Sequence, residues 1–116
     1  MSAAGWDVVI VGGGPAGCAA AISARRLKLR ALVLERHHPV QPPPCDGWLG
    51  PAAVRACRAC GVDAARHGTR FKGLRLWPWD LSAATDVADP ELAGLLVEPA
   101  ALGQALLEAA RRAGAE

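Results

Sequence analysis

One short glycine-rich segment, 12–17, constrains the fold more than any other part of this sequence. It follows an apolar run rich in β-branched residues, 6–11, and it opens a stretch with helical periodicity, 15–28, that has small residues on one side. A second apolar run, 30–35, follows and ends in an acid. A strand, a glycine turn, a helix and a strand in this order predict a βαβ unit with a right-handed crossover and with its strands buried in a parallel sheet.

The glycine spacing matches the pattern G-x-G-x-x-G, and each of its glycines has a physical reason. Gly12 permits the tight turn, Gly14 leaves room for a phosphate group against the backbone, and Gly17 lets the helix approach the strand closely. Free amides and the positive helix dipole at this N-terminus favour an anion. Glu35 ends the second strand about 20 residues further on, the spacing of a carboxylate that accepts hydrogen bonds from a ribose.

These features together predict a dinucleotide site, for which FAD and NAD are both candidates. A carboxylate at Glu35 would repel a 2′-phosphate, so a ligand of the NADP type is disfavoured at this position. The alternative interpretation is a tight strand–helix turn that binds no ligand, followed by an ordinary surface glutamate.

The rest of the chain predicts a continuation of the mixed α/β pattern. Prolines and glycines mark its turns and helix ends, and alternating apolar and basic residues mark a half-exposed strand. The expected elements are, in order, a loop over 37–47, a helix from 51 to about 60 closed by Gly61, a strand over 69–77, a turn at 78–80 into 81–87, a strand at 95–97, and a helix that begins at Pro99 and ends before Gly114.

Charge and hydropathy exclude several classes of protein. Thirteen Lys and Arg against 11 Asp and Glu give a net charge of +2, too nearly balanced for a typical nucleic-acid binder. No basic stretch precedes the first apolar run, and the uncharged run 8–24 is interrupted by glycines and a proline, unlike a membrane helix. We therefore expect a cytoplasmic chain whose cysteines are reduced.

The four cysteines are interpreted mainly as small apolar residues. Cys57 and Cys60 form a C-x-x-C pair, but a zinc site needs about four ligands and few other candidates lie near. On one helix the two share a face and pack well, so we assign them, with Cys18, to the core. Cys45 stands in a loop and is the thiol to test for reactivity.

The remaining conspicuous side chains have ordinary explanations. His37 and His38 form a doublet in a proline-rich loop, where histidines are usually solvated. Trp77 and Trp79 are expected to cover a small core at a turn, with stacking on an aromatic ring as the alternative. No spacing of nucleophile and base marks a catalytic residue.

Residues 7–17 (DVVIVGGGPAG), with 33–36 (VLER), strongly resemble the N-terminus of the FAD-dependent oxidoreductases of the glutathione-reductase-like flavoprotein superfamily. Residues 44–51 (PCDGWLGP) look like a segment of its geranylgeranyl reductase and aromatic hydroxylase branch, and 71–77 and 97–116 occupy the places of that branch's next strand and helix. The resemblance implies an α/β fold, an incomplete Rossmann-like βαβ FAD-binding domain with a short β-hairpin insertion.

In such proteins the glycine fingerprint binds the ADP half of FAD. The resemblance therefore implies that Glu35 binds the adenosine ribose, that Arg36 lies beside the adenine, and that the stretch 45–50 approaches the flavin. The residues implied to cradle the pyrophosphate are Gly12, Gly13, Gly14, Pro15, Ala16 and Gly17.

The resemblance also implies that residues 1–116 are the N-terminal portion of one FAD-binding domain. Its parts would be the fingerprint (1–36), a loop and helix (37–68), a β-hairpin region (69–97) and a helix (98–114). A downstream Gly-Asp motif of the superfamily is absent, so we expect a fragment without catalysis of its own, and we assign no catalytic residue and no metal.

In the complete protein, NAD(P)H would donate a hydride to FAD. The reduced flavin would then either reduce an apolar or aromatic small molecule or activate oxygen that reacts with it. Two alternatives stay open. One is a non-catalytic nucleotide-binding or docking module, and the other is an NAD-dependent Rossmann enzyme.

Overall fold

The computed structural model describes residues 5–37 and 45–116. His38 and most of the proline-rich stretch expected as a loop lie outside the described residues. The elements are, in order, β1 (Val8–Val11), α1 (Pro15–Arg26), β2 (Ala31–Leu34), β3 (Trp48–Leu49), α2 (Pro51–Ala59), the 3-10 helix η1 (Ala64–His67), β4 (Gly68–Phe71), β5 (Leu74–Leu76), β6 (Thr85–Val87), β7 (Gly94–Val97) and α3 (Pro99–Arg112).

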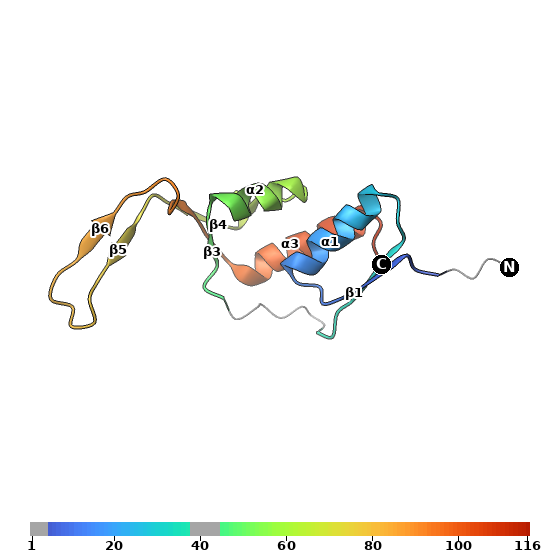
Figure 1. The fold of residues 1–116 in the computed structure, drawn as a ribbon, viewed down its shortest axis with the longest axis horizontal. Helices are drawn as coiled ribbons and strands as arrows, with labels where there is room; N and C mark the ends of the chain where they lie inside the picture. Colours follow the sequence, from blue (N-terminus) through green and yellow to red (C-terminus); the bar gives the residue numbers. More distant parts are fainter. Residues whose placement is uncertain (1–4, 38–44) are drawn as a thin grey trace.

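The N-terminal part is the predicted βαβ unit. β1 and β2 pair in parallel, with Val8 opposite Ala31 and Val11 opposite Leu34, and α1 connects them (Figure 1). α1 presents small side chains to the interior, so Cys18 and Ala21 are fully buried. The fold class predicted from the glycine segment is therefore confirmed.

α3 packs against α1 and supplies the other half of the core. The apolar side of α3 faces the interior, where Leu102, Leu106 and Ala109 are all buried. Glu98 caps the helix by accepting hydrogen bonds from the backbone of its first turn, a signal that the sequence analysis did not use. Gly114 ends it at a φ of 94°, as expected for a C-terminal glycine.

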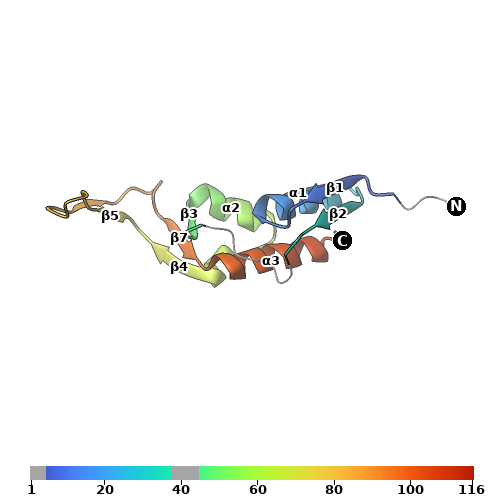
Figure 2. The same ribbon diagram turned by 90° about the horizontal axis from the view of Figure 1, so that it is seen from below.

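The backbone at Glu116 returns to the sheet beside β2, on the edge opposite β1. The Glu116 amide donates to the carbonyl of Ala31 at 3.1 Å, and the Val33 amide donates to the carbonyl of Glu116 at 2.6 Å. This is the hydrogen-bond pattern of a parallel strand pair. Residue 116 therefore lies alongside β2, as Figure 2 shows at the end marked C.

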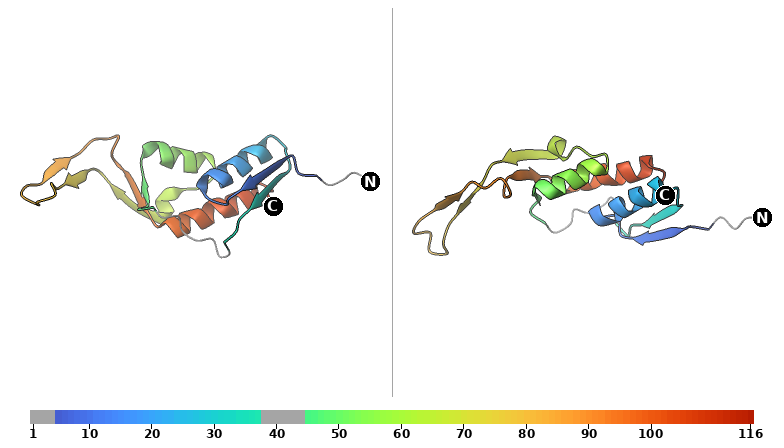
Figure 3. Two further views of the ribbon diagram at one scale, coloured as in Figure 1. Left: turned by 60° about the horizontal axis from the view of Figure 1, so that its bottom comes forward. Right: turned by 45° about the horizontal axis from the view of Figure 1, so that its top comes forward.

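A second sheet holds β3, β7 and β4, with β7 in the centre and both neighbours antiparallel to it. α2 lies alongside this sheet (Figure 3). The predicted helix and the strand around 95–97 are confirmed, whereas β3 and η1 were not predicted. η1 forms because the Asp63 carboxylate accepts a hydrogen bond from the Ala65 amide at 3.2 Å.

The prediction of a single strand over 69–77 is wrong. The chain changes sheets at Gly73, so β4 pairs with β7 whereas β5 pairs with β6. A Cβ on Gly73 would lie 2.4 Å from the carbonyl oxygen of Val87, so only glycine allows this crossing. The returning strand, β6, begins at Thr85 rather than at 81.

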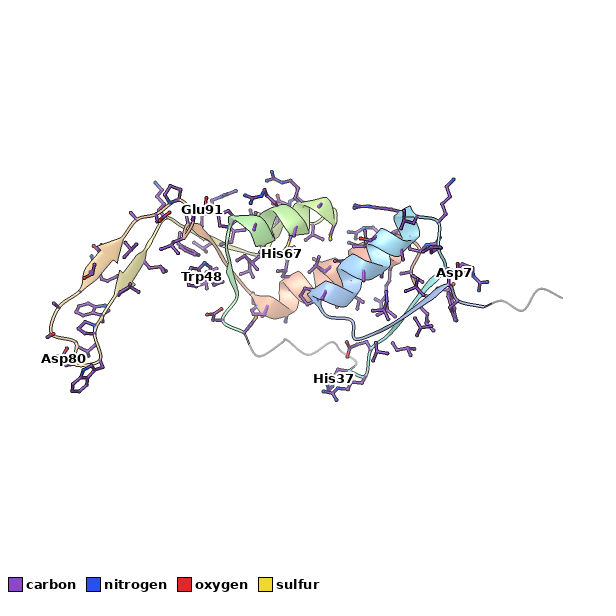
Figure 4. The ribbon with its side chains drawn as sticks, in the orientation of Figure 1. Asp7, His37, Trp48, His67, Asp80 and Glu91 are labelled. Atoms are coloured by element: carbon purple, nitrogen blue, oxygen red, sulfur yellow. The ribbon has the colours of Figure 1, made fainter. Side chains whose placement is uncertain are left out.

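The β5–β6 hairpin projects from the body of the molecule (Figure 1). The radius of gyration is 17.7 Å, against about 13 Å for a compact chain of this length. Trp77 is 55% exposed and Trp79 is 96% exposed, so the prediction that they cover a small core is wrong. Figure 4 shows Asp80 at the tip of the hairpin, far from His37.

The first two strands were expected to be buried on both faces, and this is also wrong. Exposure alternates along β1, where Val9 and Val11 are 52% and 85% exposed, and Leu34 at the end of β2 is 49% exposed. α1 covers one face of this two-stranded sheet, and within residues 5–37 and 45–116 no element covers the other. None of the described helices is long and apolar enough to cross a membrane.

The close approach of α1 to β1 generates a stability prediction. A Cβ on Gly17 would lie 1.9 Å from the carbonyl oxygen of Gly12, which is backbone and cannot swing away. Gly17→Ala should therefore lower the free energy of unfolding, measured with urea, by roughly 1–3 kcal/mol. Gly103→Ala, in α3, is the matched control because its Cβ would meet nothing within 4 Å, and it should stabilise the chain slightly. Equal stability of the two variants would contradict this account of the glycine.

Candidate dinucleotide-binding site

The glycine segment turns the chain sharply between β1 and α1. Gly12 has a φ of 106°, a conformation that favours glycine, and its amide donates to the carbonyl of Leu34 at 2.8 Å. The turn thus begins while the backbone is still hydrogen-bonded to β2. The role assigned to Gly12 from the sequence agrees with this geometry.

The N-terminus of α1 is open to solvent. Gly14 is the N-cap residue, Pro15 and Ala16 are exposed, and among the described side chains none caps the helix and no acid lies in its first turn. A Cβ on Gly14 would meet nothing within 4 Å. Because the amides of a first turn have no partner within the helix, free donors and the positive end of the dipole face an open space. The donor set suits a diphosphate.

Glu35 lies directly beside this turn. Its Oε2 accepts a hydrogen bond from the Gly13 amide at 2.7 Å, and its Oε1 accepts one from the His37 amide at 2.9 Å. These backbone donors, that of His37 first and that of Gly13 next, lower the pKa of the Glu35 carboxyl. Each carboxylate oxygen still has a lone pair for a further donor. The structure thus brings the predicted acid and the predicted glycines together.

A cavity of about 280 Å³ continues from Glu35 toward α3. Val33, Leu107 and Ala110 give it apolar walls, and Arg111 adds a positive charge. The α3 residues were missed by the sequence analysis, because they reach Glu35 only through the packing of α3 on α1. His37 was expected to be solvated, but its side chain also lines this cavity.

The other residues implied by the resemblance lie further out. Arg36 is exposed, and its Nε lies 3.0 Å from Nε2 of His37. The stretch 45–50 belongs to the β3–β7–β4 sheet, where the Gly47 carbonyl accepts a hydrogen bond from the Val97 amide at 2.9 Å. No hydrogen bond joins 45–50 to the glycine turn within the described parts of the chain. Cys45 is exposed.

The buried cysteines pack in the interior as small apolar side chains. Cys18 is fully buried, and its thiol donates to the carbonyl of Gly13 at 3.3 Å. Burial raises the pKa values of Cys18 and Cys57, so both remain protonated thiols at neutral pH. Cys57 is buried and Cys60 half-buried, which confirms that they pack into the core.

The hydrogen bonds to Glu35 generate a prediction on pH. A folded-state pKa below the ordinary value of 4.5 stabilises the fold above that pH, and this contribution is lost as pH falls through the lowered pKa. Between pH 6 and pH 3, the free energy of unfolding measured with urea should therefore fall more steeply for the wild-type chain than for Glu35→Gln. Glu108→Gln, on α3, is the control and should follow the wild-type slope. Parallel curves for wild type and Glu35→Gln would contradict the assignment.

Comparison with known proteins agrees with this geometry. The sequence profile of a family described as pyridine nucleotide-disulphide oxidoreductase matches residues 6–75. No curated protein sequence matches the chain.

Several solved structures share the fold. A geranylgeranyl bacteriochlorophyll reductase-like protein from Thermoplasma acidophilum is 25% identical over 96% of this chain, with a TM-score of 0.79. The myxobacterial chondrochloren halogenase, an FAD-dependent enzyme, is 24% identical over 95% of the chain, with a TM-score of 0.77. p-Nitrophenol 4-monooxygenase from Pseudomonas putida is 23% identical over 92%, with a TM-score of 0.73.

The chain spans 29%, 27% and 29% of the lengths of these three proteins, respectively. The profile match covers more than half of the residues and includes the whole βαβ unit with Glu35. The chain therefore belongs to the pyridine nucleotide-disulphide oxidoreductase family of FAD-dependent flavoproteins and has the Rossmann-like fold of their FAD-binding N-terminal domain.

Proposed function

We propose that this chain binds the ADP half of FAD and is the N-terminal portion, 1–116, of the cofactor domain of an oxidoreductase. One observation carries the proposal: an open helix N-terminus lies beside a carboxylate that is held on the same glycine turn. Positive and negative binding groups are then spaced as a diphosphate and its ribose require. The family and the neighbours support FAD as the dinucleotide.

Each predicted site residue has a role in this proposal. The amides of Gly14, Ala16 and Gly17 would donate hydrogen bonds to the pyrophosphate, and Gly12, Gly13 and Pro15 set the turn that aims them. Glu35 would accept hydrogen bonds from the ribose hydroxyls while it holds the Gly13 amide.

The cavity beyond Glu35 would receive the adenine. Its walls at Val33 and Leu107 are apolar, as a flat ring requires, and Arg111 lies at its rim. Arg36 and His37 follow Glu35 in the chain and would close the adenine end from the solvent side.

When bound, FAD supplies hydride transfer and oxygen chemistry, which protein side chains lack. The chain has no C-x-x-x-x-C dithiol after β2, so a reductase or monooxygenase-like activity is proposed rather than disulfide reduction. NAD(P)H would be the hydride donor, and the substrate of the complete protein an apolar or aromatic small molecule.

Binding of ADP and FAD by matched glycine variants tests the proposal. Gly14 and Gly50 are both N-cap residues at a φ of −71°, each precedes a proline, and a Cβ on either meets nothing within 4 Å. Gly14→Val should abolish binding of both ligands in calorimetry while the chain stays folded, because its side chain fills the space for the pyrophosphate. Gly50→Val should bind ADP like the wild type.

The outcomes separate the candidate functions. Equal ADP affinity of Gly14→Val and wild type would refute the site. Binding of NAD but not of FAD would show that the chain belongs to an NAD-dependent protein and not to a flavoprotein. Because the chain is expected to have no catalysis of its own, binding of FAD without oxidation of NAD(P)H fits both the flavoprotein portion and the nucleotide-binding module, whereas oxidation of NAD(P)H would exclude the module.

The role of Glu35 toward the ribose has its own test. Glu35→Ala should weaken ADP binding by roughly tenfold, since charge-assisted hydrogen bonds are lost. Comparison with 2′-deoxy-ADP separates ribose contact from support of the turn. If Glu35 binds the 2′-hydroxyl, the variant should distinguish the two ligands less than the wild type does. Equal discrimination by both proteins would leave Glu35 only a structural role.

A further inference from the structure

A second cavity, away from the glycine turn, lies between α2 and the β3–β7–β4 sheet. It has a volume of about 440 Å³, in the range of sites that hold small molecules. Its walls are largely apolar and include Pro51 and Val54 of α2 and Leu95 of β7. None of the residues assigned to dinucleotide binding lines it.

Three cations surround this cavity, which we call the basic groove. Arg55 comes from α2, Arg70 from β4, and Lys72 follows β4 directly. Arg70 belongs to β4, and Lys72 lies two residues further on, just past the end of the strand. α2 lies along the same sheet and adds Arg55 to the groove.

The position of Arg70 in the sheet is unusual for a charged residue. It lies opposite Leu95, which in turn lies opposite Leu49. Directly opposed residues of antiparallel strands share a face, so Arg70 continues a row of two leucines, of which Leu95 is only 1% exposed. The sheet thus brings a guanidinium to the edge of an apolar surface.

Within residues 5–37 and 45–116, no carboxylate pairs with these three cations. The ion pairs lie elsewhere, and Arg75 on the neighbouring hairpin binds both oxygens of Asp86, at 2.6 and 2.8 Å. No acid lines the basic groove. Three like charges around one apolar surface repel one another, and a bound anion would relieve this repulsion.

We infer that the basic groove binds a small organic anion with an apolar body. A carboxylate would lie between the guanidinium groups of Arg55 and Arg70, with Lys72 beside it, since a guanidinium can donate two hydrogen bonds to a carboxylate. The hydrocarbon part would lie over Pro51 and Val54. This inference does not depend on the dinucleotide proposal, because the two sites share no residue.

Octanoate is the probe, and 1-octanol and inorganic phosphate are its two matched comparisons. Titration of the full chain, followed through the methyl NMR signals of Val54 and Leu95, should give saturable shifts with octanoate. Octanol lacks the charge and phosphate lacks the chain, so each should bind at least about threefold more weakly. Higher salt should weaken the binding of octanoate.

Variants then test the cations. Arg55→Gln and Arg70→Gln should each raise the octanoate dissociation constant about twofold to fivefold. Arg58→Gln, also on α2 but outside the basic groove, should leave it unchanged, and urea unfolding confirms that each variant is folded. Gly14→Val, which removes the proposed dinucleotide site, should bind octanoate like the wild type.

Several results would overturn the inference. Octanol binding as tightly as octanoate would reduce the basic groove to an apolar patch, and phosphate binding as tightly would make it a simple anion site. Unchanged affinity in Arg70→Gln, or no saturable shift in the wild-type chain, would remove the site altogether.

Discussion

The contact between Gly17 and the carbonyl of Gly12 is the constraint on which the βαβ unit depends. It brings the first turn of α1 against the end of β1, so the helix axis and its free amides are fixed relative to the strand. That placement leaves Cys18 hydrogen-bonded beneath the turn and Glu35 hydrogen-bonded above it. A side chain at Gly17 would clash with this carbonyl, and one at Gly12 would be strained at a φ of 106°, so either would disturb the turn that carries the proposed site.

Electrostatics in the site follow from this backbone geometry. The Gly13 and His37 amides surround the Glu35 carboxylate, so it stays charged although it lies close to the apolar cavity. The site therefore contains a negatively charged acid and, one turn away, the positive end of an uncapped helix. The same arrangement uses backbone donors almost entirely, and such a site tolerates wide variation in its side chains.

Much of this architecture could be predicted from the sequence, and the misses have physical reasons. The glycine spacing, the β-branched runs and the prolines at helix starts act over a few residues, and they predicted the βαβ unit, α2 and α3. The sheet change at Gly73 depends on the carbonyl of Val87, which lies in another strand. Likewise, Arg111 reaches the Glu35 cavity only through tertiary packing. Short sequence patterns cannot predict either of these long-range contacts.

The return of the chain to β2 has a consequence for how the fingerprint is assembled. Arg25, at the end of α1, donates to the carbonyl of Ala113, 88 residues away, and Glu116 pairs with both Ala31 and Val33. Closing so long a loop costs entropy before its contacts form, which makes folding of such topologies slow. The glycine turn therefore depends on contacts made far along the chain. It acquires its final surroundings only when a distant helix has docked, so nucleotide affinity should develop late in folding.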